Sequence, residues 1–106
     1  MLFTRNKPYT QETLLAKEDI LELIQFERFC RDNALWDSMA TCFAKDSYVN
    51  ISWFKGTGSE FVTSSKEMNR YAPHQIHNSQ IWINDTRAVA IMQATIQTRL
   101  PMQNVE

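Results

Sequence analysis

The sequence predicts an α+β domain in which helices cover an antiparallel sheet. Apolar residues recur at helical spacing in three stretches before Pro73, whereas residues 47–54 alternate between apolar and polar side chains as a strand does. Two longer strand-like stretches follow, residues 74–84 and 87–100, separated only by the turn Asn84-Asp85-Thr86. Strands joined in this way pair antiparallel, and a preceding block of helices is typical of the α+β class.

The size and charge of the chain bound its organisation and its partners. Its 106 residues fit one domain, placed at residues 14–106 after a polar N-terminal arm of residues 1–13 that contains Pro8. Lys and Arg number 11 and Asp and Glu 12, so no basic excess favours a nucleic-acid partner. No stretch approaches the roughly 18 apolar residues of a membrane helix, and the N-terminus lacks a signal-peptide pattern. We therefore expect a cytoplasmic protein with no membrane partner.

Two helices are expected before the first strand. The first covers residues 14–30, with an apolar stripe of Ile20, Leu23, Ile24, Phe26, Phe29 and Cys30. Glu27 and Arg31 are four residues apart, which predicts an ion pair on the surface of this helix. The second helix covers residues 36–44, with a buried face of Trp36, Met39, Ala40 and Phe43.

After these two helices, the sequence predicts a strand, a third helix and a hairpin of two strands. Residues 47–54 form a strand with Val49, Ile51 and Trp53 on one face and Tyr48, Asn50, Ser52 and Phe54 on the other. After a turn at residues 56–58, Thr57 and Glu60 have the spacing of a capping box, which predicts a helix from about Ser59. This helix ends before Pro73 and packs through Phe61, Val62, Ser65, Met68 and Ala72. The last strand, ended by Pro101, turns Ala88, Ala90, Met92, Ala94 and Ile96 inward.

The two cysteines, Cys30 and Cys42, have no histidine or further cysteine at metal-ligand spacing. We interpret them as small buried apolar side chains rather than as a disulfide or a reactive site. No residue pattern indicates a cofactor, so none is expected.

Several short motifs resemble one family. Asp32 is followed by Trp36-Asp37, the segment Cys42-Phe-Ala-Lys-Asp46 leads into a strand, and Gly58 opens a helix. The segment His74-Gln-Ile-His77-Asn78 begins a strand, and Asn84-Asp-Thr-Arg-Ala88 follows it. In this order the motifs resemble the SnoaL-like branch of the nuclear-transport-factor-two-like superfamily, which includes scytalone dehydratase, over residues 19–100.

The resemblance implies a cone-shaped, curved antiparallel sheet wrapped around the N-terminal helices, a cystatin-like α+β barrel that encloses a pocket. Members include dehydratases, cyclases, ketosteroid isomerases and non-catalytic binding modules, and many are dimers, so we expect a homodimer. The chain differs from the family in two ways. It ends after the third expected strand, so we expect it to lack the family's C-terminal strands. The remaining wall of the sheet is then either absent from this sequence or supplied by a partner. At the positions of the pocket tyrosines of scytalone dehydratase it has Arg31 and Ile51.

The resemblance places the family's catalytic histidine at His74 and its buried acid at Asp32. A neutral imidazole can take up and return a proton near neutral pH, and a carboxylate can hold its ring in one tautomer. The alternatives are an exposed His74 that bonds only water and an Asp32 that caps the following helix. His77 lies three residues after His74 and so faces the other side of a regular strand.

Further residues are candidates for substrate contacts. Trp36, Trp53 and Met92, together with Phe43 and Trp82, either line an apolar ligand cavity or belong to an ordinary core. Tyr48 and Asn50 share one strand face and are candidates for polar contacts. Asn78 is a candidate for bonding a ligand carbonyl, with pairing inside the sheet as the alternative.

Two functions follow. The first is a cofactor-independent lyase or isomerase, dehydratase-like, that acts on a small, apolar, oxygenated ring compound through His74 and Asp32. The alternative is a non-catalytic ligand-binding or dimerisation module of the same fold. Hydrogen bonding between the two side chains beside a cavity of about 300 Å³ or more favours the first. A filled interior, or His74 in solvent, favours the second.

Overall fold

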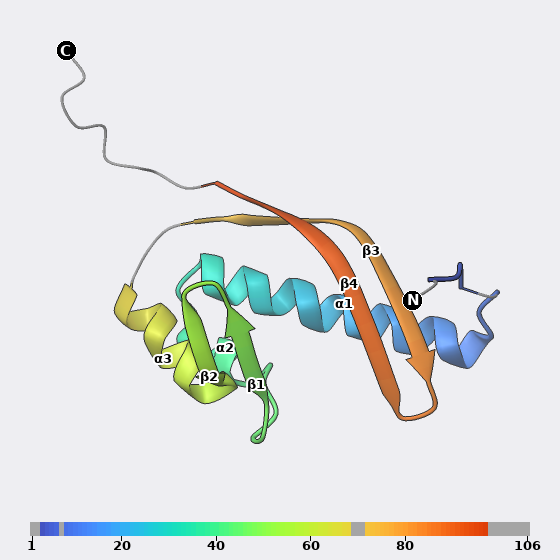
Figure 1. Ribbon diagram of the computed structural model, residues 1–106, viewed down its shortest axis with the longest axis horizontal. Coiled ribbons are helices and arrows are strands. Elements are labelled where there is room, and N and C mark those ends of the chain that lie inside the picture. The colour runs from blue at the N-terminus through green and yellow to red at the C-terminus, as the bar shows by residue number, and fades with distance from the viewer. Residues whose placement is uncertain (1–2, 7, 69–71, 98–106) are drawn as a thin grey trace, which may run out of the picture.

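The computed structural model describes residues 3–6, 8–68 and 72–97, and within them it confirms an α+β protein with antiparallel strands (Figure 1). The elements in chain order are α1 (Gln11–Asp32), α2 (Trp36–Ala40), β1 (Tyr48–Ile51), β2 (Phe54–Thr57), α3 (Gly58–Met68), β3 (His74–Asn84) and β4 (Arg87–Ile96). None of the helices in these ranges has the length and apolar character that crossing a membrane requires.

Helix α1 begins before the predicted position because two threonines cap it. Thr10 is the N-cap, and its hydroxyl accepts a hydrogen bond from the Thr13 amide at 3.1 Å, while Thr13 Oγ1 accepts one from the Thr10 amide at 2.8 Å. This reciprocal pair replaces two hydrogen bonds that the first helical turn lacks. The helix therefore starts at Gln11 rather than at residue 14.

The burial of α1 differs from the predicted apolar stripe. Cys30 is fully buried, but Leu23 and Phe29 are about half exposed, at 48% and 54%. Glu27 is only 6% exposed, so the prediction that it pairs with Arg31 on the surface was wrong. The pair exists, but α1 turns this charged position towards the interior and leaves part of its apolar stripe uncovered.

Helix α2 is shorter than predicted and ends at Ala40 instead of Ala44. The amides of Thr41, Cys42 and Phe43 each bond the carbonyl three residues earlier, at 3.0–3.4 Å, so the α-helical pattern is replaced by tight turns. The Thr41 hydroxyl also donates to the Ser38 carbonyl, at 2.6 Å, and competes with the helical bonds there.

The predicted strand 47–54 is in fact a hairpin. β1 and β2 pair antiparallel, with Tyr48 opposite Thr57 and Ile51 opposite Phe54, and the chain reverses at Ser52-Trp53. The predicted turn at residues 56–58 was therefore wrong, because Gly56 and Thr57 belong to β2. Continuous alternation hid the reversal, since Trp53 in the turn still contributes an apolar side chain, with its ring centroid 5.7 Å from that of Phe61.

Helix α3 confirms the predicted capping box. The Thr57 hydroxyl accepts from the Glu60 amide at 3.1 Å, and Glu60 Oε1 accepts from the Thr57 amide at 3.0 Å. Gly58 is required at the first position because a Cβ there would collide with Phe43 Cβ and Ser47 Oγ. The continuation predicted beyond Met68 falls partly on residues 69–71, outside the described residues.

The long hairpin β3–β4 matches the predicted strands up to Ile96, and the rest of the predicted strand, residues 98–100, lies outside the described residues. The pairing shifts between His77 and Gln80, where Asn78 adopts a φ of 51°. Of the residues predicted to face inward, Ala90 and Met92 are half-buried, but Ala88, Ala94 and Ile96 are exposed. The prediction fails for those three because no described element covers this part of β4.

The strands form two separate two-stranded sheets, and the described residues contain no closed barrel. The core consists of Cys30, Met39, Phe61 and Val62, with Trp36, Phe43, Val49 and Phe54 packed around it. The bent β3–β4 hairpin crosses α1 at a distance from this core (Figure 1). Residues of the N-terminal segment contact the hairpin, since the Asn6 amide donates to the Ile81 carbonyl at 2.8 Å.

Candidate functional site

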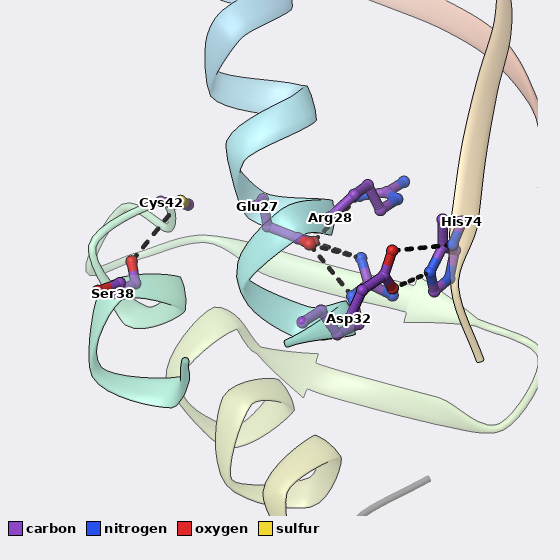
Figure 2. Close-up of polar contacts among 7 residues, drawn as sticks. Glu27, Arg28, Asp32, Ser38, Cys42 and His74 are labelled. Atoms are coloured by element: carbon purple, nitrogen blue, oxygen red, sulfur yellow. Dashed lines mark hydrogen bonds and ion pairs between the residues drawn. The ribbon is translucent and has the colours of Figure 1, made fainter. Parts of the chain in front are cut away.

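Asp32, at the C-terminal end of α1, and His74, the first residue of β3, are joined by two hydrogen bonds (Figure 2). Asp32 Oδ2 accepts from the backbone amide of His74 at 2.9 Å, and Asp32 Oδ1 lies 2.6 Å from His74 Nδ1. One carboxylate therefore holds both the backbone and the ring of the histidine. Forty-two positions separate the two residues in sequence, so tertiary structure creates the pair.

The local alternative for Asp32, a cap for the following helix, is not observed. The N-cap of α2 is Leu35, and no side chain caps that helix, so the capping alternative does not hold. A negative charge at the C-terminal end of α1 also opposes the helix dipole, at a typical cost of about 0.3–1 kcal/mol. The bonds to His74 and the positive charge of Arg28, one helical turn earlier, offset that cost.

Both side chains are largely shielded from water. The His74 side chain is 10% exposed and that of Asp32 is 14% exposed, which excludes a His74 that bonds only water. An ionised carboxylate only accepts hydrogen bonds, so Nδ1 of a neutral His74 is the donor. Nε2 is then left with a free lone pair, the state needed in a general base.

A cavity of about 280 Å³ adjoins the pair, close to the expected size. Besides Asp32 and His74, its lining comprises Arg31, Trp36, Trp53, Ser65, Met68, Ala72 and Ile96. Three helices, α1, α2 and α3, and both strands of the long hairpin contribute residues to this lining. A second hollow of about 320 Å³ also borders Asp32 and His74, together with Gln25, Arg28, Phe29, Asn33 and Ile76.

A buried ion-pair network supports the end of α1 (Figure 2). Glu27 receives hydrogen bonds from Arg31 Nε and Nη2 and from Arg28 Nη1. The Arg31 guanidinium also lies 4.9 Å from the centroid of the Phe61 ring, a cation–π arrangement. Burial lowers the pKa of Arg28, an effect that the charge of Glu27 opposes. Arg31 is thereby fixed in the cavity wall at the position where the resemblance leads one to expect a tyrosine.

The predicted substrate-contact residues divide into two groups. Trp36 and Trp53 line the cavity with Asp32 and His74. Met92 is half-buried elsewhere on β4, and Tyr48 and Asn50 are exposed on β1, so none of these three lies in the cavity wall. Asn78 is also exposed, and its amide donates to Gln93 Oε1 at 3.1 Å, across the hairpin.

Among the described residues, His77 and the two cysteines do not line the cavity. His77 lies on the exposed side of β3, 3.0 Å from Thr95 Oγ1. Within the described residues, no group of three or more His, Cys, Asp or Glu side chains is placed to hold a metal ion. Both cysteines are free thiols, and burial raises their pKa values, which disfavours the reactive thiolate.

Sequence reasoning missed two polar residues of the cavity, Arg31 and Ser65. The signal for Ser65 was present, because it interrupts the apolar face Phe61-Val62-Met68 that was predicted for the third helix. A hydroxyl on a packed helix face needs a partner, and that requirement marks the position as unusual. For Arg31 the signal was its place in the family resemblance, at the position of a pocket tyrosine. Local sequence alone gave none, because an arginine in the last turn of a helix is common.

Residues 12–105 match a family model described as a SnoaL-like domain, which confirms the predicted resemblance of the chain to this family. Neither the curated proteins nor the solved structures compared with the chain gave a significant match.

Proposed function

Because the chain belongs to the SnoaL-like domain family, within the nuclear-transport-factor-two-like superfamily, we propose that it binds a small oxygenated ring compound and transfers a proton on it. The observation that carries this proposal is the shielded Asp32–His74 pair beside a cavity of about 280 Å³. The reaction class is a cofactor-independent isomerisation or dehydration. The cavity is close to the lower end of the range for ligand sites, about 300–1,000 Å³, which suits a compound of one or two rings.

In the proposed reaction His74 is the general base. Nε2 takes a proton from a carbon next to a carbonyl group, and the electron pair of the broken C–H bond moves into an enolate. Asp32 then faces an imidazolium, which its carboxylate stabilises while keeping the ring in place. Return of the proton to another carbon completes an isomerisation. Transfer to a leaving hydroxyl group releases water and completes a dehydration.

The walls of the cavity suit this chemistry. Trp36, Trp53 and Met68 supply apolar surface for a ring, and they limit the water that would compete for the proton. In the family, a cone-shaped sheet encloses the pocket. Here the described strands leave the sheet open, so we propose that a second copy of the chain or further strands complete the enclosure.

A homodimer is the assembly we propose. The uncovered apolar side chains on β4, Val89, Ile91 and Ile96, are 46–58% exposed. Each strand of the long hairpin also has one edge without a partner among the described residues, and such edges favour pairing between chains. Light scattering coupled to size-exclusion chromatography measures the mass in solution, and a monomer at all concentrations would contradict a dimer.

The alternative is a non-catalytic binding module of the same family. The observation in its favour is that Arg31 and Ile51 stand where scytalone dehydratase has its water-binding tyrosines. Such a module would use the same cavity but would not move a proton. The two functions therefore differ in one measurable property, which is proton exchange on a bound ketone.

The test follows exchange of the C2 protons of 1-indanone for deuterium by NMR in D₂O. We expect the wild type to accelerate exchange and His74→Gln to lower the protein-catalysed rate at least about 100-fold, the typical contribution of a general base. His77→Gln is the matched control, because it makes the same change at the exposed histidine of the same strand, and it should keep the wild-type rate. Equal rates for the wild type and His74→Gln would reject catalysis and leave the binding module.

A further inference from the structure

We infer that the Ser65 hydroxyl recognises the ligand, by donating a hydrogen bond to a carbonyl oxygen of the bound ring compound. Ser65 is 6% exposed and lines the cavity beside Asp32 and His74. Its Oγ is buried and has no hydrogen-bond partner among the described residues. This inference rests on the proposed function, because it assumes that the cavity holds a small molecule, and it adds the chemical feature by which that molecule is selected.

A buried hydroxyl without a partner is unusual and calls for an explanation. Most buried polar side-chain atoms in proteins are hydrogen-bonded, because an unpaired one costs about the same as a lost hydrogen bond. A serine inside a helix usually avoids this cost by donating to the carbonyl four residues earlier. Thr63 does this in the same helix, with its hydroxyl 3.3 Å from the Ser59 carbonyl. Ser65 does not, and no other described residue bonds its hydroxyl, so we take this hydroxyl to be available to a group that enters the cavity.

The neighbouring charge indicates which kind of group this is. Arg31 lines the same cavity, and its Nε and Nη2 are both bonded to Glu27. Its guanidinium has only donors and keeps its positive charge, so it favours an oxygen that accepts hydrogen bonds and carries negative charge. A carbonyl oxygen meets both requirements, and it gains negative charge as an enolate forms. The rest of the lining is largely apolar, which suits the hydrocarbon part of the compound.

A ligand-binding role and a purely structural role of Ser65 predict different results for Ser65→Ala. If the hydroxyl only filled space, Ser65→Ala would change stability but not the choice of ligand. If it binds a carbonyl, Ser65→Ala removes an unpaired polar atom from the unliganded protein, so the melting temperature should stay the same or rise. The preference for an oxygenated ligand should be lost at the same time.

The experiment compares 1-indanone with indane, which have the same ring skeleton and differ only in the carbonyl oxygen. Each is titrated into the full-length chain, and the quenching of tryptophan fluorescence reports binding, because Trp36 and Trp53 line the cavity. We expect the wild type to bind 1-indanone about tenfold more tightly than indane, since one good hydrogen bond is of that order. Ser65→Ala should bind both compounds with the affinity of the wild type for indane.

Ser64→Ala is the matched control, because it makes the same change one position earlier on α3, at a serine that does not line the cavity. It should keep the tenfold preference. Equal binding of both compounds by the wild type, or a preference that persists in Ser65→Ala, would overturn the inference and leave the small-molecule cavity intact. If neither compound binds, the inference and the proposed function both fail. Because binding is measured without turnover, loss of activity in His74→Gln does not affect this result.

Discussion

The body of the molecule and the β3–β4 hairpin are stabilised by different interactions. The body consists of α2, α3, β1, β2 and the end of α1. In the body, Cys30, Met39 and Phe61 are at most 2% exposed and pack in one cluster. In the hairpin Ile81 is buried, but Val89 and Ile91 on β4 are 58% and 46% exposed. Packing therefore stabilises the body. The hairpin depends on its own pairing, on the buried Ile81, on the contact of Trp82 with Phe3 and on a few polar contacts with α1 and the N-terminal segment.

The candidate site lies where these two regions meet. Asp32 and Ser65 belong to the body, and His74 is the first residue of the hairpin. The two bonds from Asp32 to His74 are thus a connection between a well-packed region and a thinly packed one. This comparison suggests that polar contacts, rather than core packing, determine the position of the proposed base.

The largest expected effect on stability comes from the core of the body. Met39→Ala should lower the free energy of unfolding by about 2–5 kcal/mol, because it removes a fully buried side chain and leaves a cavity. Ile91→Ala, on the exposed side of β4, should cost less than about 1 kcal/mol. Urea unfolding followed by circular dichroism measures both. Both costs refer to the dissociated monomer at low protein concentration, where an Ile91→Ala cost equal to that of Met39→Ala would contradict this comparison. A cost of Ile91→Ala that rises with protein concentration is the result expected if the proposed homodimer covers β4.

A smaller and more local effect is expected from Asp32→Asn. The amide has one acceptor oxygen and one NH₂ group. If the oxygen keeps the bond from the His74 backbone amide, Nδ1 faces the NH₂ group, so the ring loses this bond or changes to the other tautomer. We expect a loss of about 1–3 kcal/mol, the cost of a shielded polar group without its partner. Hydrogen exchange should accelerate at the start of β3 more than in α3. Uniform acceleration across both regions would contradict a local role for Asp32 in holding the hairpin.

The smallest expected effect is a pH dependence of the free energy of unfolding that arises from the capping box of α3. The hydrogen bond from the Thr57 amide lowers the pKa of Glu60 from its ordinary 4.5. A carboxyl whose pKa is lower in the folded protein contributes stability above its unfolded pKa. That contribution is lost as the pH falls through the lowered value.

The corresponding measurement is the free energy of unfolding against pH for the wild type and Glu60→Gln. The wild type should lose more stability than the variant as the pH falls from 7 to below 4.5, with Glu12→Gln, at an exposed glutamate in the first turn of α1, as the control. Parallel curves would show that the capping bond of Glu60 does not depend on its charge. Because Glu60 is exposed, the difference should be small and should decrease with added salt.

Local patterns predicted helices and strands well where a short motif fixes the residue at which an element begins or ends. The Thr57–Glu60 capping box located the start of α3, and the turn at Asn84-Asp85-Thr86 located the long hairpin. The reversal at Ser52-Trp53 was missed, because alternating aromatic and β-branched residues look the same in one strand as in two short paired strands. The apolar stripe of α1 was only partly buried, since periodicity identifies a face but not what covers it.

The residues of the candidate site were also predicted only in part from the sequence. The motif resemblance identified His74 and Asp32, and aromatic content identified Trp36 and Trp53, which line the cavity. Tyr48, Asn50 and Asn78 were chosen because of their strand faces, and they lie on the exposed surface. Alternation along a strand separates two faces but cannot say which of them meets a cavity.

By itself, the sequence determined the class of the fold and the positions of most helices and strands, because these depend on spacing, capping and side-chain chemistry. The family resemblance of its motifs selected Asp32 and His74 as the candidate site. Only the tertiary structure decided that Asp32 bonds His74, that Glu27 is buried, and that Ser65 lines the cavity with no hydrogen-bond partner among the described residues. Each of these three properties depends on which distant segments come into contact. Distance in space and access to water belong to the folded chain, and no local pattern of residues specifies them.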